Sequence, residues 1–86
     1  MKVLKFYGTW CQPCKLLDPI FEEIEENYDV DIKHVDVDDD ANAELMTEHA
    51  IRSLPTVVFL DDDGEVIETL VGTKKKREYT EIIENN

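Results

Sequence analysis

The sequence predicts a single α/β domain over residues 1–86, with a four-stranded mixed sheet flanked by three helices in the order βαβαββα. Strand-like and helix-like periodicities alternate along the first half of the chain, which is typical of parallel strand–helix–strand units. A short turn then joins the last two strand-like runs, and so short a connection requires antiparallel neighbours. A chain of 86 residues has room for one hydrophobic core only.

The first predicted strand and helix lie between residues 2 and 28. Lys2–Tyr7 carries apolar side chains on both faces, which predicts a central, covered strand. Residues 8–10 are expected to form a loop. From about Cys11 the apolar residues recur at spacings of three and four, which indicates a helix, and Pro19 should kink it. The apolar stripe of this helix consists of Leu16, Leu17, Ile20, Phe21, Ile24 and Tyr28.

A second strand, a short helix and a third strand are expected next. The charged positions within Val30–Val37 suit a strand at an exposed edge of the sheet, where charge discourages pairing with another chain. Asp40 is a plausible N-cap for the short helix that follows. The uninterrupted apolar run Val57–Leu60, just beyond Pro55, predicts a buried strand.

The last third of the chain reads as a hairpin followed by a helix. Asp61–Gly64 has the composition of a hairpin turn, with Gly64 at the position that needs a positive φ. Glu65–Val71 is the returning strand, Gly72 ends it, and Thr73 can cap the final helix. The apolar stripe of that helix consists of Tyr79, Ile82 and Ile83.

Charge and composition exclude several classes of function. Asp and Glu number 21 against 9 Lys and Arg, a net charge of −12, so a nucleic-acid-binding surface is not expected. The longest apolar run is far too short to cross a membrane. No targeting segment is recognisable in residues 1–7, and we therefore expect a cytoplasmic protein. We also expect it to work as a monomer.

The chemistry of the sequence is concentrated in Cys11 and Cys14. A cysteine that caps a helix lies where free N–H groups and the helix dipole favour an anion, which should lower the pKa of the Cys11 thiol. Cys14 follows about one turn later, within reach of a disulfide. Pro13 is tolerated because a first-turn N–H has no intrahelical partner. With only two cysteines and no secretory signal, redox or metal chemistry is favoured over a secreted disulfide framework.

Two other readings of the cysteine pair remain open. Zinc would need two further ligands, for which His34 and His49 are the candidates, but their spacing matches no zinc finger or ribbon. The pair could also be buried and inert. We expect no metal and no cofactor beyond a redox-active disulfide.

The segment Trp10–Lys15, with sequence WCQPCK, resembles the active-site motif of thioredoxins, in which Gly usually stands in place of Gln12. Ile51–Thr56, with sequence IRSLPT, resembles the segment that carries the cis-proline of that family. Three further residues fall where the family has its kinking proline, its hairpin glycine and its post-hairpin glycine: Pro19, Gly64 and Gly72. The likeness extends from about Val3 to Ile83.

The resemblance implies a role for each of these positions. Cys11 would be the attacking nucleophile and Cys14 the resolving thiol. The Leu54–Pro55 bond would be cis and lie against the cysteines, and the backbone of Leu54 would pair with an extended substrate segment. The remaining residues of the substrate-docking surface would be Trp10, Pro13, Ser53 and Gly72.

The chain departs from the family in two respects. It begins at the family's second strand, so the usual N-terminal strand and helix are missing and the size is closer to glutaredoxins. At the position of the family's buried acid stands Lys5, and His34 replaces the lysine that accompanies that acid. Lys5 either stabilises the thiolate from beneath or extends its ammonium outward over apolar surface. His34 either relays a proton or faces water at the sheet edge.

The expected activity is thiol–disulfide exchange, in which the dithiol of Cys11 and Cys14 reduces disulfides of other proteins. Either a thioredoxin reductase or glutathione would restore the dithiol. Two alternatives are kept: a glutathione-dependent glutaredoxin, which the short length favours, and a redox-fold binding subunit whose cysteines are incidental.

Overall fold

The computed structural model describes all 86 residues, Met1–Asn86, and shows the predicted α/β fold with a four-stranded sheet. The strands are β1 (Lys2–Tyr7), β2 (Asp31–Asp36), β3 (Thr56–Leu60) and β4 (Val66–Val71). The helices are α1 (Gln12–Leu16), α2 (Asp18–Asn27), α3 (Ala43–Glu48) and α4 (Lys76–Glu84), and the 3-10 turn η1 (Asp40–Asn42) precedes α3. No helix is both long enough and apolar enough to span a membrane.

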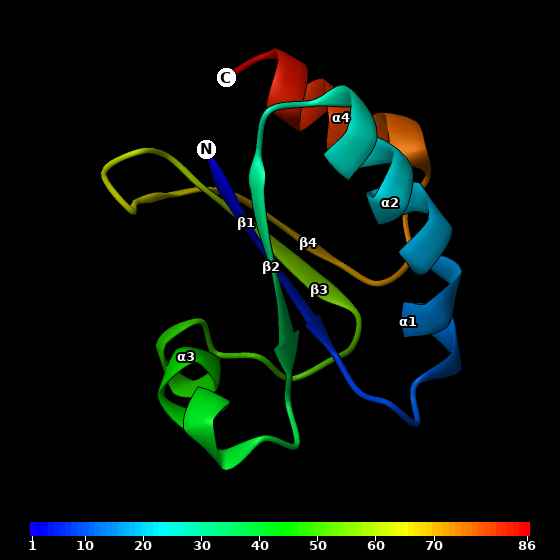
Figure 1. Ribbon diagram of the computed structural model, residues 1–86. Helices are drawn as coiled ribbons and strands as arrows, with labels where there is room; N and C mark the ends of the chain where they lie inside the picture. Colours follow the sequence, from blue (N-terminus) through cyan, green and yellow to red (C-terminus); the bar gives the residue numbers. More distant parts are fainter.

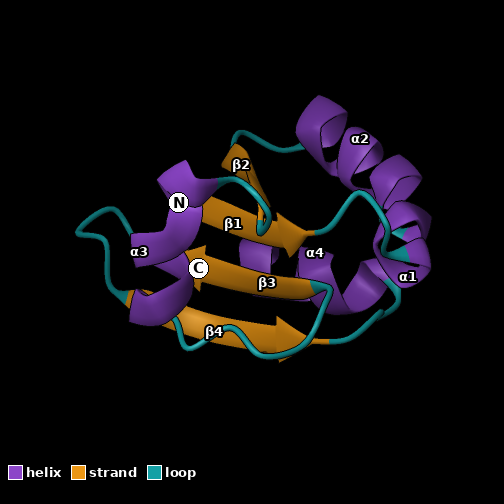
Figure 2. Ribbon diagram, turned by 90° about the horizontal axis from the view of Figure 1, so that it is seen from below, coloured by secondary structure: helices purple, strands orange, loops and turns teal.

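The sheet is mixed, as the connections require. Its strand order is β2-β1-β3-β4, which Figure 2 shows edge to edge. The β1 strand pairs in parallel with β2 and antiparallel with β3, and β3 pairs antiparallel with β4. The charged strand β2 therefore occupies an edge, as its sequence predicts, while the apolar strands β1 and β3 are central.

Two hydrophobic clusters lie on opposite faces of the sheet. In Figure 1, α1, α2 and α4 lie on one side of the sheet and α3 on the other. The larger cluster joins the sheet to α2 and α4 through Phe21, Ile24, Tyr79 and their neighbours, with the Phe21 and Tyr79 rings 5.1 Å apart edge to face. The smaller cluster lies beneath α3. This division explains why β1 and β3 carry apolar residues on both faces.

The register of the strands brings four loops to one end of the sheet. Phe6 near the end of β1 pairs with Thr56 at the start of β3, and Thr56 in turn pairs with Val71 at the end of β4. Tyr7 pairs with Asp36 at the end of β2. The segments that continue from these residues, which include Cys11, Pro55 and Gly72, therefore emerge side by side.

The single kinked helix expected after Cys11 is wrong in detail, because the structure divides it into α1 and α2. Leu17 separates the two helices and Pro19 lies in the first turn of α2. Proline lacks an N–H and fits best where no intrahelical bond is lost, so it begins a new helix here.

Both predicted caps are also displaced. Asp39, not Asp40, caps the segment before α3, and its side chain accepts the Ala41 N–H at 3.0 Å. The N-cap of α4 is Lys75 rather than Thr73. The hairpin agrees with expectation, since Gly64 has a φ of +83°.

Candidate active site

The two cysteines lie at the start of α1, as a disulfide whose Cα atoms are 5.3 Å apart. Cys11 is the N-cap residue, with extended backbone angles of −88° and 105°, and its Sγ accepts the Cys14 N–H at 3.3 Å. Pro13 occupies the first turn, where its missing N–H costs nothing. A thiolate at Cys11 would receive the same N–H group and the positive end of the helix dipole. This geometry favours an anion at one of the two sulfurs.

The two sulfurs face different surroundings, although both cysteines are almost fully buried. Cys11 lines a mostly apolar hollow of about 550 Å³, which we call the docking groove. One wall is Trp10–Pro13, the other is Ile51, Arg52 and Leu54, and Val37 and Met46 complete the lining. Cys14 does not line this groove. It lines a smaller hollow of about 220 Å³, together with residues 7–9, Lys15 and Asp18.

Two hydrogen bonds join the three loops that surround the disulfide. The Gly72 N–H donates to the carbonyl of Pro55 at 2.8 Å, and the Thr73 hydroxyl donates to the carbonyl of Pro13 at 3.3 Å. The Leu54–Pro55 peptide bond is cis, and Pro55 is buried. Gly72 has a φ of +88°, a conformation that glycine adopts without steric cost. The segments expected to form the docking surface are thus held against one another.

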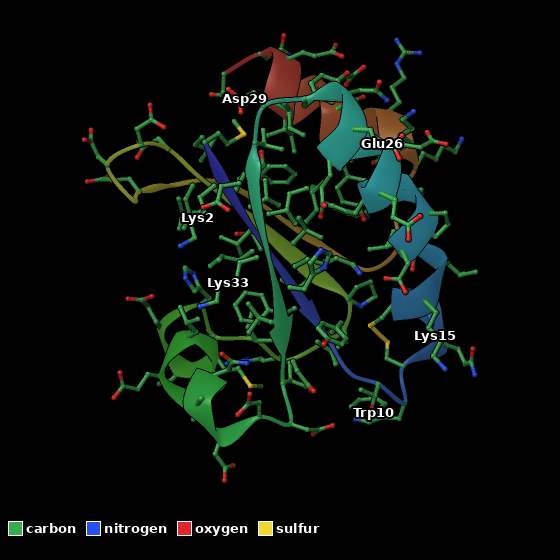
Figure 3. The ribbon with its side chains drawn as sticks, viewed as in Figure 1. Lys2, Trp10, Lys15, Glu26, Asp29 and Lys33 are labelled. Carbon is green, nitrogen blue, oxygen red and sulfur yellow. A yellow bond between two sulfur atoms is a disulfide. The ribbon has the colours of Figure 1, made fainter.

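Trp10 projects from the loop before α1 and is 64% exposed. Figure 3 shows it below the disulfide, at the outer end of the site. Its indole N–H donates to the Asp38 carboxylate at 2.7 Å. The ring also lies over Gly8, where an added Cβ would come within 2.7 Å of the indole carbon Cε2. A hydrogen bond on one side and a glycine on the other therefore fix this large apolar side chain at the mouth of the groove.

The charged side chain of Lys5 lies in the core, only 2% exposed. Its Nζ donates to Asp18 Oδ1 at 2.6 Å and lies 5.7 Å and 5.8 Å from the ring centroids of Tyr7 and Phe21. Lys5 therefore does not extend into water, because its ammonium ends at a carboxylate from α2. Asp18 lines the same hollow as Cys14, and neither Lys5 nor Asp18 lines the docking groove.

The other residues singled out from the sequence lie around this centre. Gln12 is exposed on the groove wall. Ser53 is exposed, and its carbonyl accepts the Thr56 hydroxyl at 2.6 Å. His34 lies on the edge strand β2, 44% exposed, with its Nε2 3.0 Å from Glu25 Oε1. It contacts α2 and does not line the groove.

Sequence reasoning missed several residues that shape the site. Asp18 and Asp38 each bind a residue far away in the chain, and no local pattern marks either of them. A lysine within a strand that is apolar on both faces does signal that a buried partner is needed, although it does not identify that partner. Four residues that line the groove were also not predicted from the sequence: Val37, Met46, Ile51 and Arg52.

Comparison with known proteins gives one family for the whole chain. The family model described as Thioredoxin matches residues 1–85. A thioredoxin of Listeria monocytogenes is 40% identical over 78 residues, which are 91% of this chain and 75% of that protein. A thioredoxin of Bacillus subtilis is 38% identical over 78 residues, again 91% of this chain, and 74% of that protein.

Solved structures agree with the sequence comparison. A mutant thioredoxin from Halobacterium salinarum superposes with a TM-score of 0.89 at 33% identity, covering 98% of this chain and 72% of that one. The reduced thioredoxin pre-protein of Schistosoma mansoni gives a TM-score of 0.86 at 32% identity, covering 98% of this chain and 76% of the other.

The Lys5–Asp18 pair predicts that replacing Asp18 lowers the unfolding free energy more than replacing Lys5 does. Replacing Asp18 by Ala leaves an ammonium buried without its partner, and we expect a loss of about 1–3 kcal/mol of unfolding free energy. Lys5→Met removes the charge and fills similar space between the two rings, so its effect should be close to neutral. Urea unfolding of the disulfide form measures both losses.

Glu22→Ala is the matched control for this experiment, because Glu22 is an exposed carboxylate on the same helix that forms no ion pair. The double variant Lys5→Met/Asp18→Ala should be about as stable as Lys5→Met alone. If Asp18→Ala costs no more than Glu22→Ala, the ion pair contributes nothing to the fold.

Proposed function

The chain belongs to the thioredoxin family, and on that premise we propose that Cys11 is the nucleophile and Cys14 the resolving thiol of its thiol–disulfide oxidoreductase activity. The observation that carries this assignment is the placement of the two sulfurs. Cys11 lies at the N-cap of α1 and lines the docking groove, whereas Cys14 lines a separate, smaller hollow.

The reaction proceeds in two exchanges. The Cys11 thiolate attacks a partner disulfide, so a mixed disulfide forms, the partner's S–S bond breaks, and the released thiolate takes a proton from solvent. Cys14 then loses its proton and attacks the Cys11 sulfur. The mixed disulfide breaks, the partner leaves with both cysteines reduced, and the dithiol is oxidised to the disulfide of Cys11 and Cys14. Two electrons pass to the partner, and no cofactor is needed beyond this cysteine pair.

We propose that the partner lies extended across the docking groove. The apolar lining suits apolar residues next to the reacting cysteine, with Trp10 covering one end. The backbone of Leu54 would pair with the extended segment, and Ser53, Pro55 and Gly72 would complete the surface. The hydrogen bond from Gly72 to Pro55 supports this arrangement, because it holds the two loops in register with each other.

The working form that we propose is a cytoplasmic monomer, recycled by a thioredoxin reductase. A reducing compartment keeps the dithiol available for reduction of partner proteins. The glutaredoxin alternative is not favoured, because the family model and the named relatives are thioredoxins.

The first prediction separates the roles of the two cysteines. Cys11→Ser should abolish reduction of a protein disulfide, because no thiolate remains in the groove. Cys14→Ser should allow the first exchange and stop the second, so that a covalent mixed disulfide accumulates and is seen by mass spectrometry. Trapping by Cys11→Ser in place of Cys14→Ser would reverse the assignment.

The double variant Cys11→Ser/Cys14→Ser tests whether the chain is only a binding subunit. We expect the double variant to fail to support growth of cells that depend on this protein. Full activity of the double variant would mean that the cysteines are incidental.

Recycling is tested by supplying one electron source at a time. With a thioredoxin reductase and NADPH, we expect repeated turnover of a protein disulfide. With glutathione alone at cellular concentrations, turnover should be slower by at least about tenfold, a difference of roughly 1.4 kcal/mol in activation free energy. The reverse order of rates would favour the glutaredoxin alternative.

The last prediction tests whether the charge of Lys5 stabilises the Cys11 thiolate. If its positive charge stabilises the thiolate, Lys5→Met should raise the pKa of the Cys11 thiol and make the disulfide a weaker oxidant. Titration of thiolate absorbance in the reduced protein measures the pKa. The adjacent Asp18 carboxylate opposes the lysine charge, so Asp18→Asn should change the pKa in the opposite direction. An unchanged pKa in both variants would remove this role for Lys5.

A further inference from the structure

The docking groove carries one charged side chain, and that charge is positive. Of the nine residues that line the groove, six are hydrophobic and only Arg52 is ionic. This is unexpected in a chain with 21 acidic residues and a net charge of −12. The sign of the groove is therefore opposite to that of the molecule.

Arg52 has no partner within the protein. It takes part in none of the six ion pairs, and its exposed side chain donates none of the side-chain hydrogen bonds. A guanidinium presents several N–H donors in a rigid plane, which matches both oxygens of a carboxylate. An arginine that finds no carboxylate in so acidic a chain is free to bind one from a partner.

The two acidic residues that contact the site, Asp18 and Asp38, have partners other than Arg52 and do not line the groove. Asp38 does not line the groove, and its Oδ2 accepts the indole N–H of Trp10. Asp18 lines the other hollow and is paired with Lys5. Arg52 therefore sets the charge that a bound segment meets inside the groove.

We propose that Arg52 makes this enzyme selective for disulfides that have an acidic side chain close to the reacting cysteine, with apolar residues beside it. The inference rests on the proposed function and adds the chemistry of the partner. Arg52 lies two residues before Leu54 on the same wall, so a segment that pairs with the Leu54 backbone passes Arg52 within a few residues of the mixed disulfide. The acidic residue is thus expected within three positions of that cysteine.

The test uses disulfide-linked peptides that differ in one residue. Glu, Gln or Lys is placed in turn at each position from three before to three after the reacting cysteine, among apolar residues. The rate constant kcat/KM is measured for the unmodified protein, for Arg52→Gln and for Arg52→Glu. Arg77→Gln is the matched control, because it removes the same charge from an exposed position on α4, away from the groove.

The unmodified protein should prefer the Glu peptide to the Lys peptide by at least about threefold at one or two positions, as expected for a partly exposed ion pair. Arg52→Gln should abolish that preference, Arg52→Glu should reverse it, and Arg77→Gln should leave it intact. The preference should also weaken as salt is added. A loss of structure alone could not reverse the order of two peptides.

A small neutral disulfide, bis(2-hydroxyethyl) disulfide, distinguishes failure of the Arg52 selectivity from failure of the oxidoreductase function. If it is reduced while Glu and Lys peptides react equally at every position, or if Arg52→Glu keeps the original order, the selectivity is overturned and the oxidoreductase function stands. If neither the small disulfide nor any peptide is reduced, the oxidoreductase function itself is overturned.

Discussion

The chemistry of this protein depends on one contact, the backbone N–H of Cys14 pointing at the sulfur of Cys11. The contact exists because Cys11 stops just short of helical conformation while the next residue has already entered α1. Free N–H groups at a helix start attract negative charge, and a sulfur held there is stabilised as an anion. A cysteine one turn deeper, such as Cys14, has no such position. The proposed difference in reactivity between Cys11 and Cys14 therefore follows from where the helix begins.

The sheet brings the other loops of the site next to the cysteines. The functional loops leave the sheet at a common end because β1, β2 and β4 finish there and β3 starts there. Mixed strand direction is what permits this, since the cis-proline segment must enter β3 from the end at which β1 exits. Hydrogen bonds from Gly72 and Thr73 then hold the loops together. The short α1 needs this support, because a helix of five residues is not stable alone.

Much of this arrangement could be predicted from the sequence. The residues that could not be predicted all depend on tertiary packing. The order of elements, the edge position of β2 and the cap at Cys11 all follow from local periodicity and turn chemistry. The division of the first helix at Leu17 does not, because a proline permits either a kink or a new start. Asp18 and Asp38 matter through hydrogen bonds to residues distant in the chain, and Arg52 matters because folding places it in a groove lined by several separate segments. Such contacts depend on the final packing, which no local pattern encodes.

The short helix α3 contributes no fully buried residue, yet its Met46 lines the docking groove. Helices that bury little apolar surface open in local fluctuations at a free energy well below that of global unfolding. Amide protons of α3 should therefore exchange with solvent deuterium earlier than those of β1 and β3, which form the centre of the sheet. One side of the groove would then adapt its shape to partners of different size, while the wall that holds the cysteines stays rigid.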